Sequence, residues 1–229
     1  MRQIPNALML FAAGFGTRMG ALTASCPKPL ISVAGKPLID HALDIATDAG
    51  IGNIVVNTHY LPDMMQTHLA GRNVTLSHED EILETGGGLR HALPLLGPDP
   101  VFTLNTDAVW TGPNPLQTLA AVWDPAKMDA LLLLIPLAQA KGHKGKGDFI
   151  PDANGTLSRG TGLIYSGAQI IKTDALPAIP QTKFSLNLLW DEMINSRRLF
   201  GIPYSGNWCD VGTLQGIKIA ETMIGTRDV

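Results

Sequence analysis

Short apolar runs alternate with longer amphipathic segments through the first half of the chain. Four runs are brief and rich in β-branched or large apolar residues, which favours buried strands: 7–12, 54–57, 74–77 and 101–104. The segments between them are long enough for helices that cross from one strand to the next: 38–49, 62–69 and 89–96. This alternation indicates a Rossmann-like, three-layer α/β/α fold around a mixed, mainly parallel sheet.

The pattern in the second half is less regular. The run 131–135 predicts another buried strand, and "PDANGT" at 151–156 predicts a tight turn between two strands. Segments 186–194 and 213–223 have helical spacing, and 199–204 has the pattern of a strand. No repeat, low-complexity block or linker separates the halves. We therefore expect one domain spanning residues 1–229.

Composition and charge narrow the class of protein. With 45% hydrophobic and 16% charged residues among 229, the chain has the composition of a compact soluble protein. Its net charge of −3 gives no basic field, so no nucleic-acid partner is expected. No apolar stretch reaches membrane-spanning length, and Cys26 and Cys209 lack metal-site spacing. We expect a cytoplasmic protein with no membrane partner.

The stretch "FAAGFGTRMG", residues 11–20, follows the first predicted strand. A dinucleotide fingerprint would need a third glycine where Met19 stands, and no acidic residue occurs between Gly14 and Asp40. The Walker lysine pattern is also absent. Small residues here would let the backbone approach a base and phosphates, with Arg18 and Lys28 as cations. A glycine turn flanked by two surface cations remains the alternative.

Four further motifs, in order, extend the pattern along the chain. "LFAAGFGTRM" (10–19) is followed by "PKPL" (27–30), "ETGGG" (84–88), "NTDAVW" (105–110) and "WCDVGT" (208–213). Together they resemble the nucleotide-sugar pyrophosphorylase, or sugar-1-phosphate nucleotidylyltransferase, family. The resemblance covers nearly the whole chain and implies the nucleotide-diphospho-sugar transferase type of fold. It also implies a nucleotide-binding part to about residue 110 and a sugar-phosphate-binding part at about 111–229.

Within the family the likeness is greatest to the N-acetylmuramate-1-phosphate uridylyltransferases of bacterial cell-wall recycling. "ETGGG", "GKGDF" (145–149) and the pair Ser166–Gly167 resemble that subfamily. Some positions depart from the wider family: Thr106 replaces a glycine, and Ser185 stands where a lysine is common. The departures leave open whether Lys183 or Arg159 takes the place of the missing sugar-phosphate lysine.

The resemblance implies a reaction and assigns residues to it. A sugar-1-phosphate oxygen attacks the α-phosphorus of a nucleoside triphosphate, here expected to be UTP, and pyrophosphate leaves. Because the nucleophile is already an anion, the site needs cations and a metal rather than a general base. The implied metal is Mg²⁺, held by Asp107 and Asp210. The implied catalytic residues are Arg18 and Lys28. The implied nucleotide-binding residues are Ala12, Ala13, Gly14, Gly16, Thr17, Asn105 and a turn formed by Thr85, Gly86 and Gly87. The implied sugar-binding residues are Gly147, Asp148 and Gly167.

Other functions remain open on the sequence. The substrate could be glucose 1-phosphate, mannose 1-phosphate or another sugar phosphate, and the nucleotide CTP or dTTP. A non-catalytic, regulatory homologue that only binds a nucleotide sugar is a further alternative. The joint presence of Arg18, Lys28, Asp107 and Asp210 argues against it, since a binding module needs no paired metal carboxylates. The sequence does not decide between a monomer and a dimer.

Overall fold

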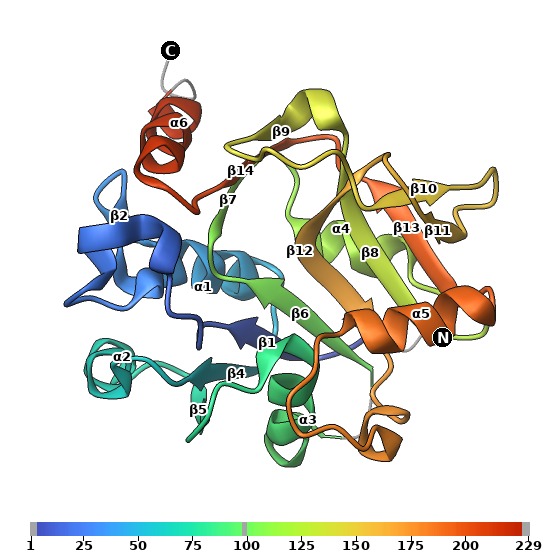
Figure 1. The fold of residues 1–229 in the computed structure, drawn as a ribbon, viewed down its shortest axis with the longest axis horizontal. Helices are drawn as coiled ribbons and strands as arrows, with labels where there is room; N and C mark the ends of the chain where they lie inside the picture. Colours follow the sequence, from blue (N-terminus) through green and yellow to red (C-terminus); the bar gives the residue numbers. More distant parts are fainter. Residues whose placement is uncertain (1–3, 98–99, 226–229) are drawn as a thin grey trace.

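A seven-stranded sheet forms the centre of the computed structural model, which describes residues 4–97 and 100–225 (Figure 1). The strand order is β13-β8-β12-β6-β1-β4-β5. The strands span β1 Ala7–Phe11, β4 Asn53–Thr58, β5 Thr75–His78, β6 Val101–Asn105, β8 Ala130–Ile135, β12 Ile164–Ile171 and β13 Leu199–Pro203. Strand β12 runs antiparallel to both β6 and β8, and the other neighbours are parallel. The expected mixed, mainly parallel sheet is confirmed.

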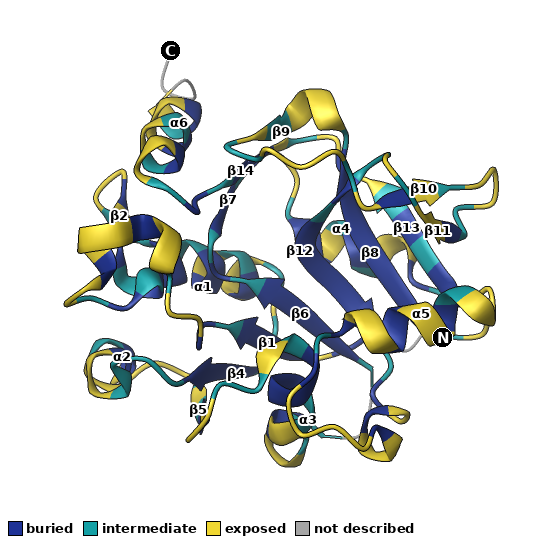
Figure 2. Ribbon diagram, in the orientation of Figure 1, coloured by how far each residue is buried: buried dark blue, intermediate teal, exposed yellow. Residues whose placement is uncertain are grey.

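Helices cover both faces of this sheet because its strands are apolar on both sides. Leu8 and Leu10 of β1 pack with α1 (Leu38–Asp48), α2 (Pro62–Leu69) and α4 (Pro115–Val122). Met9, between them, points to the opposite face and packs with α3 (Glu84–Leu96) and α5 (Asn187–Asn195). Figure 2 shows the central strands buried along most of their length. This two-sided burial produces the continuous apolar runs seen in the sequence.

A smaller sheet and two hairpins lie beside the main sheet. The small sheet has the order β7-β14-β9, from Ala108–Thr111, Asn207–Asp210 and Ala140–Lys141. One hairpin pairs β2 (Ser32–Val33) with β3 (Lys36–Pro37), and the other pairs β10 (Phe149–Pro151) with β11 (Leu157–Arg159). Helix α6 (Leu214–Gly225) packs on the small sheet. Short 3-10 helices span Thr17–Thr23, Lys28–Leu30, Leu137–Gln139 and Leu176–Ala178.

The expected turn at Thr85–Gly87 is wrong, because these residues form the first turn of α3. The amides of Gly86 and Gly87 both donate hydrogen bonds to the carbonyl of Phe184, at 2.9 and 3.0 Å. A side chain on Gly86 would overlap the Phe184 ring, so the glycines let α3 pack closely on this segment. Three consecutive glycines have poor helix propensity, and this tertiary packing overrides it.

The remaining expected elements agree with the structure to within a few residues. The turn at 151–156 joins β10 to β11, where the Asp152 side chain accepts hydrogen bonds from the amides of Asn154 and Thr156. Helix α6 begins at Leu214, after Thr213, whose hydroxyl accepts from the Gly216 amide at 3.1 Å. Among the described residues, no helix is both long and apolar enough to cross a bilayer.

Candidate active site

The carboxyl ends of β1 and β6 lie side by side and present the first acidic group of the site. Strand β6 ends at Asn105, and Thr106 follows it. The Thr106 hydroxyl donates to the carbonyl of Phe11 at 2.8 Å, which ties the two strand ends together. Asp107 comes next in the chain. The threonine that departs from the family pattern is buried and therefore fixes the backbone that carries Asp107.

Lys28 reaches Asp107 from the segment after the glycine-rich loop. Its Nζ lies 2.7 Å from Asp107 Oδ2, and its side chain is only 11% exposed. Gly16 makes room for it: Gly16 has φ +64°, and an added Cβ there would lie 2.8 Å from the Lys28 Cβ. Any other residue at 16 would be strained and would press on the lysine. The second glycine of the loop is thus required by the position of Lys28.

The second acidic group, Asp210, comes from the small sheet. Antiparallel pairing places Asp210 opposite Ala108, and the Val211 amide donates to the Asp107 carbonyl at 2.8 Å. Burial, and then the charge of Asp107, raise the pKa of Asp210, while Arg18, Lys28 and His143 oppose that rise. The His143 Nδ1 lies 3.9 Å from Asp210 Oδ2. Asp107 and Asp210 are 103 positions apart in the sequence, but the fold brings their carboxylates close enough to repel each other.

Arg18 faces the same carboxylate from the glycine-rich loop. Its Nη1 lies 3.7 Å from Asp210 Oδ2, and its side chain is 63% exposed. The backbone of Gly212 lies directly against it, since an added Cβ on Gly212 would come within 2.8 Å of the Arg18 Cζ. At this separation the ion pair is loose, and most of the guanidinium remains open to an anionic ligand.

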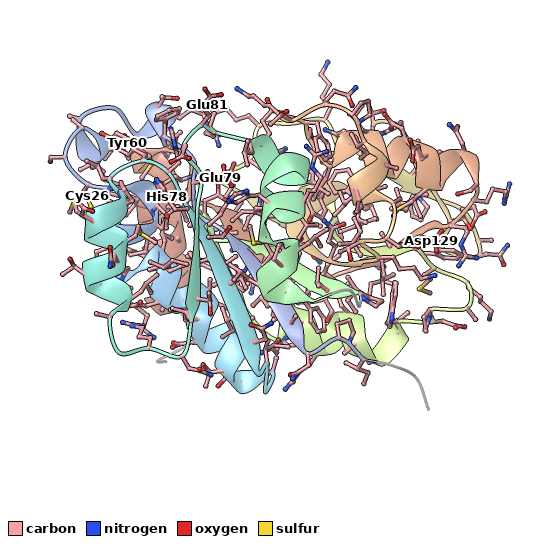
Figure 3. The ribbon with its side chains drawn as sticks, turned by 90° about the horizontal axis from the view of Figure 1, so that it is seen from below. Cys26, Tyr60, His78, Glu79, Glu81 and Asp129 are labelled. Atoms are coloured by element: carbon pink, nitrogen blue, oxygen red, sulfur yellow. The ribbon has the colours of Figure 1, made fainter. Side chains whose placement is uncertain are left out.

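The loop that carries Arg18 is anchored at its far end. The Thr23 hydroxyl donates to the Gly16 carbonyl at 3.1 Å, which closes the loop on itself. The Tyr60 hydroxyl donates to the carbonyls of Thr23 and Ala24 at 2.9 and 3.1 Å. Figure 3 shows Tyr60 beside Cys26, next to this loop. Arg18 is therefore presented by an ordered segment.

The donor set of Asp107 and Asp210 suits a hard divalent cation. Mg²⁺ is typically held by one or two carboxylates together with substrate phosphates and water, and burial followed by the charge of Asp107 raises the pKa of Asp210 in this pair. Among the described residues, no group of three or more His, Cys, Asp or Glu side chains is placed to hold a metal alone. The site accordingly fits a cation that shares its coordination with a bound nucleotide.

A cavity of about 220 Å³ opens beside Lys28 and Asp107. Backbone of the glycine-rich loop forms one side, where nothing lies within 4 Å of an ideal Cβ on Gly14. A ligand can therefore approach the main chain there. Its lining residues are Phe11, Ala12, Ala13, Gly14, Lys28, Pro29, Asn57, Glu79, Ile82, Glu84, Thr85, Asn105, Thr106 and Asp107.

Two buried polar side chains shape the floor of this first cavity. Asn57 Oδ1 accepts from the Ala12 amide at 2.6 Å, and Asn57 Nδ2 donates to Glu79 Oε1 at 2.7 Å. Glu79 Oε2 accepts from the Leu83 amide at 3.0 Å, just before α3. Figure 3 shows Glu79 on the segment that leads into α3. This chain of hydrogen bonds joins the glycine-rich loop to the start of α3.

A second cavity, of about 290 Å³, adjoins the first. The two share Phe11, Thr85 and Asn105 in their linings. Asp148 lines the second cavity, and its Oδ2 accepts from the Tyr165 amide at 2.9 Å. The remaining lining residues are Phe149, Arg159, Tyr165, Ser185, Leu186, Asn187 and Trp190. An elongated ligand with two chemically different ends could occupy both cavities.

Most of the residues expected at the site lie together. Arg18, Lys28, Asp107 and Asp210 converge, and the first cavity is lined by Ala12, Ala13, Gly14, Thr85 and Asn105. Gly147 and Gly167 have φ of +99° and +89°, so both occupy conformations that favour glycine. A Cβ on Gly167 would lie 2.8 Å from the Asn105 Cβ, so this glycine makes room for Asn105. Thr17 is exposed at the start of its 3-10 helix.

Other expected residues have a different place, and several site residues were missed. Gly86 and Gly87 pack against the 182–184 segment and are not among the described residues that line the first cavity. Of the two candidates for the missing lysine, Arg159 lines the second cavity and Lys183 does not. Sequence reasoning missed a set of neighbours with no motif of their own: Asn57, Glu79, Tyr165 and Trp190. Asn57 alone carried a signal, as a polar residue ending a predicted strand.

Comparisons with known proteins agree with this geometry. The sequence family described as the MobA-like NTP transferase domain matches residues 8–141. The N-acetylmuramate alpha-1-phosphate uridylyltransferase of Caulobacter vibrioides is 38% identical, covering 98% of this chain and 99% of the relative. The enzyme of the same name from Neisseria meningitidis serogroup B is 35% identical, covering 95% and 97%.

A solved structure shows the same fold. A putative glucose-1-phosphate thymidylyltransferase from Bacillus anthracis superposes with a TM-score of 0.81 at 17% identity, covering 97% of this chain and 96% of that one. The match at residues 8–141 takes in more than half of the chain, and both sequence relatives match it nearly end to end. The chain therefore belongs to the MobA-like NTP transferase family, which confirms its resemblance to the sugar-1-phosphate nucleotidylyltransferases.

Proposed function

We propose that the protein transfers a uridylyl group from UTP to N-acetylmuramate 1-phosphate, giving UDP-N-acetylmuramate and pyrophosphate. The observation that carries the proposal is the convergence of Arg18, Lys28, Asp107 and Asp210 beside two adjoining cavities. The substrate pair is suggested by the two relatives that match almost the whole chain. The role fits the recycling of cell-wall sugars, and the unpaired Cys26 and Cys209 suit a reducing cytoplasm.

The first cavity takes the nucleotide in this proposal. The backbone of Ala12, Ala13 and Gly14 lies against the base and ribose, with Thr85 and Asn105 opposite. Gly16 and Thr17 turn the chain so that Arg18 meets the triphosphate. The second cavity takes the sugar, beside Asp148 and near the backbone of Gly147 and Gly167. The nucleotide part then ends at about residue 110, and later residues bind the sugar phosphate.

The transfer step needs alignment and charge neutralisation. An oxygen of the sugar phosphate forms a bond to the α-phosphorus of UTP, and the bond from that phosphorus to the bridging β-phosphate oxygen breaks. The electron pair leaves with pyrophosphate, so no proton has to be removed from the nucleophile. Lys28 offers a point charge where the two substrates meet, and Arg18 offers a fork of donors to the departing pyrophosphate. Both cations stabilise charge that would otherwise keep two anions apart.

Asp107 and Asp210 are proposed to hold Mg²⁺. When bound, the ion supplies Lewis-acid neutralisation of the phosphate oxygens. The chain's own contribution is to hold both carboxylates at the ends of β6 and β14, with Lys28 already paired to Asp107. This arrangement fixes the distance between the carboxylates before the substrates arrive.

A matrix of substrates tests the proposal. The protein is incubated with Mg²⁺, each of four nucleoside triphosphates and a panel of sugar 1-phosphates, and pyrophosphate release is measured. UTP with N-acetylmuramate 1-phosphate is expected to give the highest kcat/KM. Release that is faster with another sugar phosphate or nucleotide would overturn the substrate assignment. No release with any pair would overturn nucleotidyl transfer itself.

A further inference from the structure

Arg159 occupies a distinct place in the second cavity. It is the one Lys, Arg or His side chain among the described residues that line this cavity. It lies on β11, whereas Arg18 and Lys28 belong to two short 3-10 helices between β1 and β2. In Figure 1, β11 and α5 lie toward the right, near β13, and β2 and its neighbouring segment lie at the left. The second cavity therefore holds one guanidinium, together with the carboxylate of Asp148, away from Lys28 and Asp107, which do not line it.

The guanidinium of Arg159 is held in one orientation. Its Nε and Nη2 donate to Asp191 Oδ1 at 3.0 and 2.7 Å, and Nη2 also approaches the Asn187 carbonyl at 3.4 Å. Its Cζ lies 4.8 Å from the centre of the Phe149 ring and 5.7 Å from that of Trp190. The aromatic contacts fix the plane of the guanidinium and reduce its hydration.

One edge of this guanidinium remains for a ligand. Asp191 takes the Nε side, and no hydrogen bond between described residues involves Nη1. Nη2 is further engaged by the Asn187 carbonyl, so the N–H groups of Nη1 are the ones left to donate to a second anionic group.

We infer that Arg159 is a specificity-determining residue that binds a carboxylate carried by the sugar itself. The inference rests on the proposed function. In the proposed function the reacting phosphate lies at Lys28 and Asp107, which line the first cavity and not the second, so Arg159 is placed beside the sugar rather than beside the phosphate. N-acetylmuramate differs from N-acetylglucosamine by a lactyl ether that ends in a carboxylate. That carboxylate is a second anionic group, in addition to the phosphate, and N-acetylglucosamine 1-phosphate lacks it.

The contact should act on binding more than on the chemical step. The lactyl carboxylate is remote from the reacting phosphorus, so its charge does not change as the new bond forms. Its contact with Arg159 is therefore equally strong in the ground state and the transition state, and such a contact affects KM rather than kcat. The prediction is a rise in KM for the sugar phosphate with a smaller change in kcat. A residue that merely held β11 in place would affect charged and uncharged sugars alike.

The test compares three substrates: N-acetylmuramate 1-phosphate, its neutral lactyl carboxamide and N-acetylglucosamine 1-phosphate. In the wild type, kcat/KM should be highest for the carboxylate. Arg159→Gln should lower the ratio of kcat/KM for carboxylate over carboxamide by at least about tenfold, through KM. Arg159→Lys, which keeps the charge but loses the fork, should lower the ratio by less. Arg197→Gln removes another arginine that pairs with an aspartate, outside the cavity lining, and should leave the ratio unchanged.

The outcomes separate this inference from the proposed function. Wild-type turnover of the carboxylate, with an unchanged selectivity ratio in Arg159→Gln, would overturn the role of Arg159 and leave the function standing. A wild type that prefers N-acetylglucosamine 1-phosphate would overturn both. Turnover of the carboxamide by Arg159→Gln reports that the variant is folded. Calorimetric titration with UDP-N-acetylmuramate and its carboxamide gives a second readout, in which the same loss of discrimination is expected without turnover.

Discussion

The hydrogen-bonded chain from Ala12 through Asn57 to Glu79 predicts a coupled loss of stability and nucleotide binding in Asn57→Ala. Asn57 and Glu79 are 3% and 1% exposed, so both bonds of the Asn57 amide lie in the interior. The substitution would leave the Ala12 amide and one oxygen of Glu79 without these partners. The backbone of Ala12 lines the first cavity, so its position should also loosen.

The magnitude follows from the two bonds. A neutral hydrogen bond contributes about 1 kcal/mol and one to a charged group about 1.5–3 kcal/mol. Glu79 keeps its bond from the Leu83 amide, and the first cavity borders both side chains, so water can replace part of the loss. We expect a destabilisation of about 2–4 kcal/mol. For a chain of this size, that corresponds to a Tm lower by roughly 4–16 °C.

Thermal unfolding and steady-state kinetics with UTP provide the assay. Asn57→Ala should lower the Tm and raise KM for UTP by at least about threefold, because the loop backbone is less well positioned. Asn53→Ala is the matched control on the same strand. Asn53 Nδ2 donates to the carbonyls of Leu95 and Leu96 at 3.0 and 3.4 Å, away from the cavity. Its removal should lower stability by at most about 1 kcal/mol and leave KM unchanged.

Comparing Asn57→Ala with Asn53→Ala tests whether the buried hydrogen bonds position the glycine-rich loop. Equal Tm losses, together with equal KM values for UTP, would refute the reasoning that the buried chain positions the nucleotide loop. A large Tm loss with an unchanged KM would show that Asn57 stabilises the fold without shaping the site.

Three further predictions use other parts of the structure. Gly88→Ala should destabilise the protein by about 1–3 kcal/mol in urea unfolding, since the added Cβ would lie 2.6 Å from Glu79 Oε1. Gly225→Ala is the control, because its Cβ would meet open space and should not destabilise the protein. Similar unfolding midpoints for the two variants would contradict this prediction. Burial alone would raise the pKa of Asp129, but hydrogen bonds from Arg198 and Lys172 outweigh burial and hold this pKa below its usual value. Asp129→Asn should therefore lower the Tm at neutral pH, and the difference should shrink as pH falls through that lowered pKa; a constant difference down to about pH 2 would contradict the ion-pair explanation. Arg18→Ala should lower kcat/KM in the pyrophosphate-release assay by at least about tenfold, and an unchanged value would place Arg18 outside the site.

Much of the fold was predictable because local pattern and tertiary packing agree. The strands that are buried on both faces, such as β1 and β8, produce apolar runs that no surface segment would carry. The strands of the small sheet are two to four residues long, too short for any periodicity to show. The start of α3 was also hidden, because Gly86 is required by contact with Phe184, 98 positions later in the chain.

The candidate site was predictable to the extent that its residues sit in motifs. Arg18, Lys28, Asp107 and Asp210 lie in four of the five quoted motifs, and the structure brings them together. Glu79 could not be identified, since a buried carboxylate whose partners are an amide and a backbone N–H has no sequence signature. The role of Gly16 likewise depends on the later position of Lys28, which only the folded chain reveals.

Figure 3 places Asp129 far from Glu79, so its stability effect can be measured apart from the site. The site itself is tested most directly by pyrophosphate release from UTP and N-acetylmuramate 1-phosphate by the wild type, Asp107→Ala and Asp44→Ala. Asp44 also pairs with a lysine, Lys36, but its side chain is 58% exposed, and it does not line the first or the second cavity. We expect wild-type turnover, little change in Asp44→Ala and a loss of at least about 100-fold in a folded Asp107→Ala. Turnover by Asp107→Ala at the wild-type rate would contradict the proposed role of Asp107.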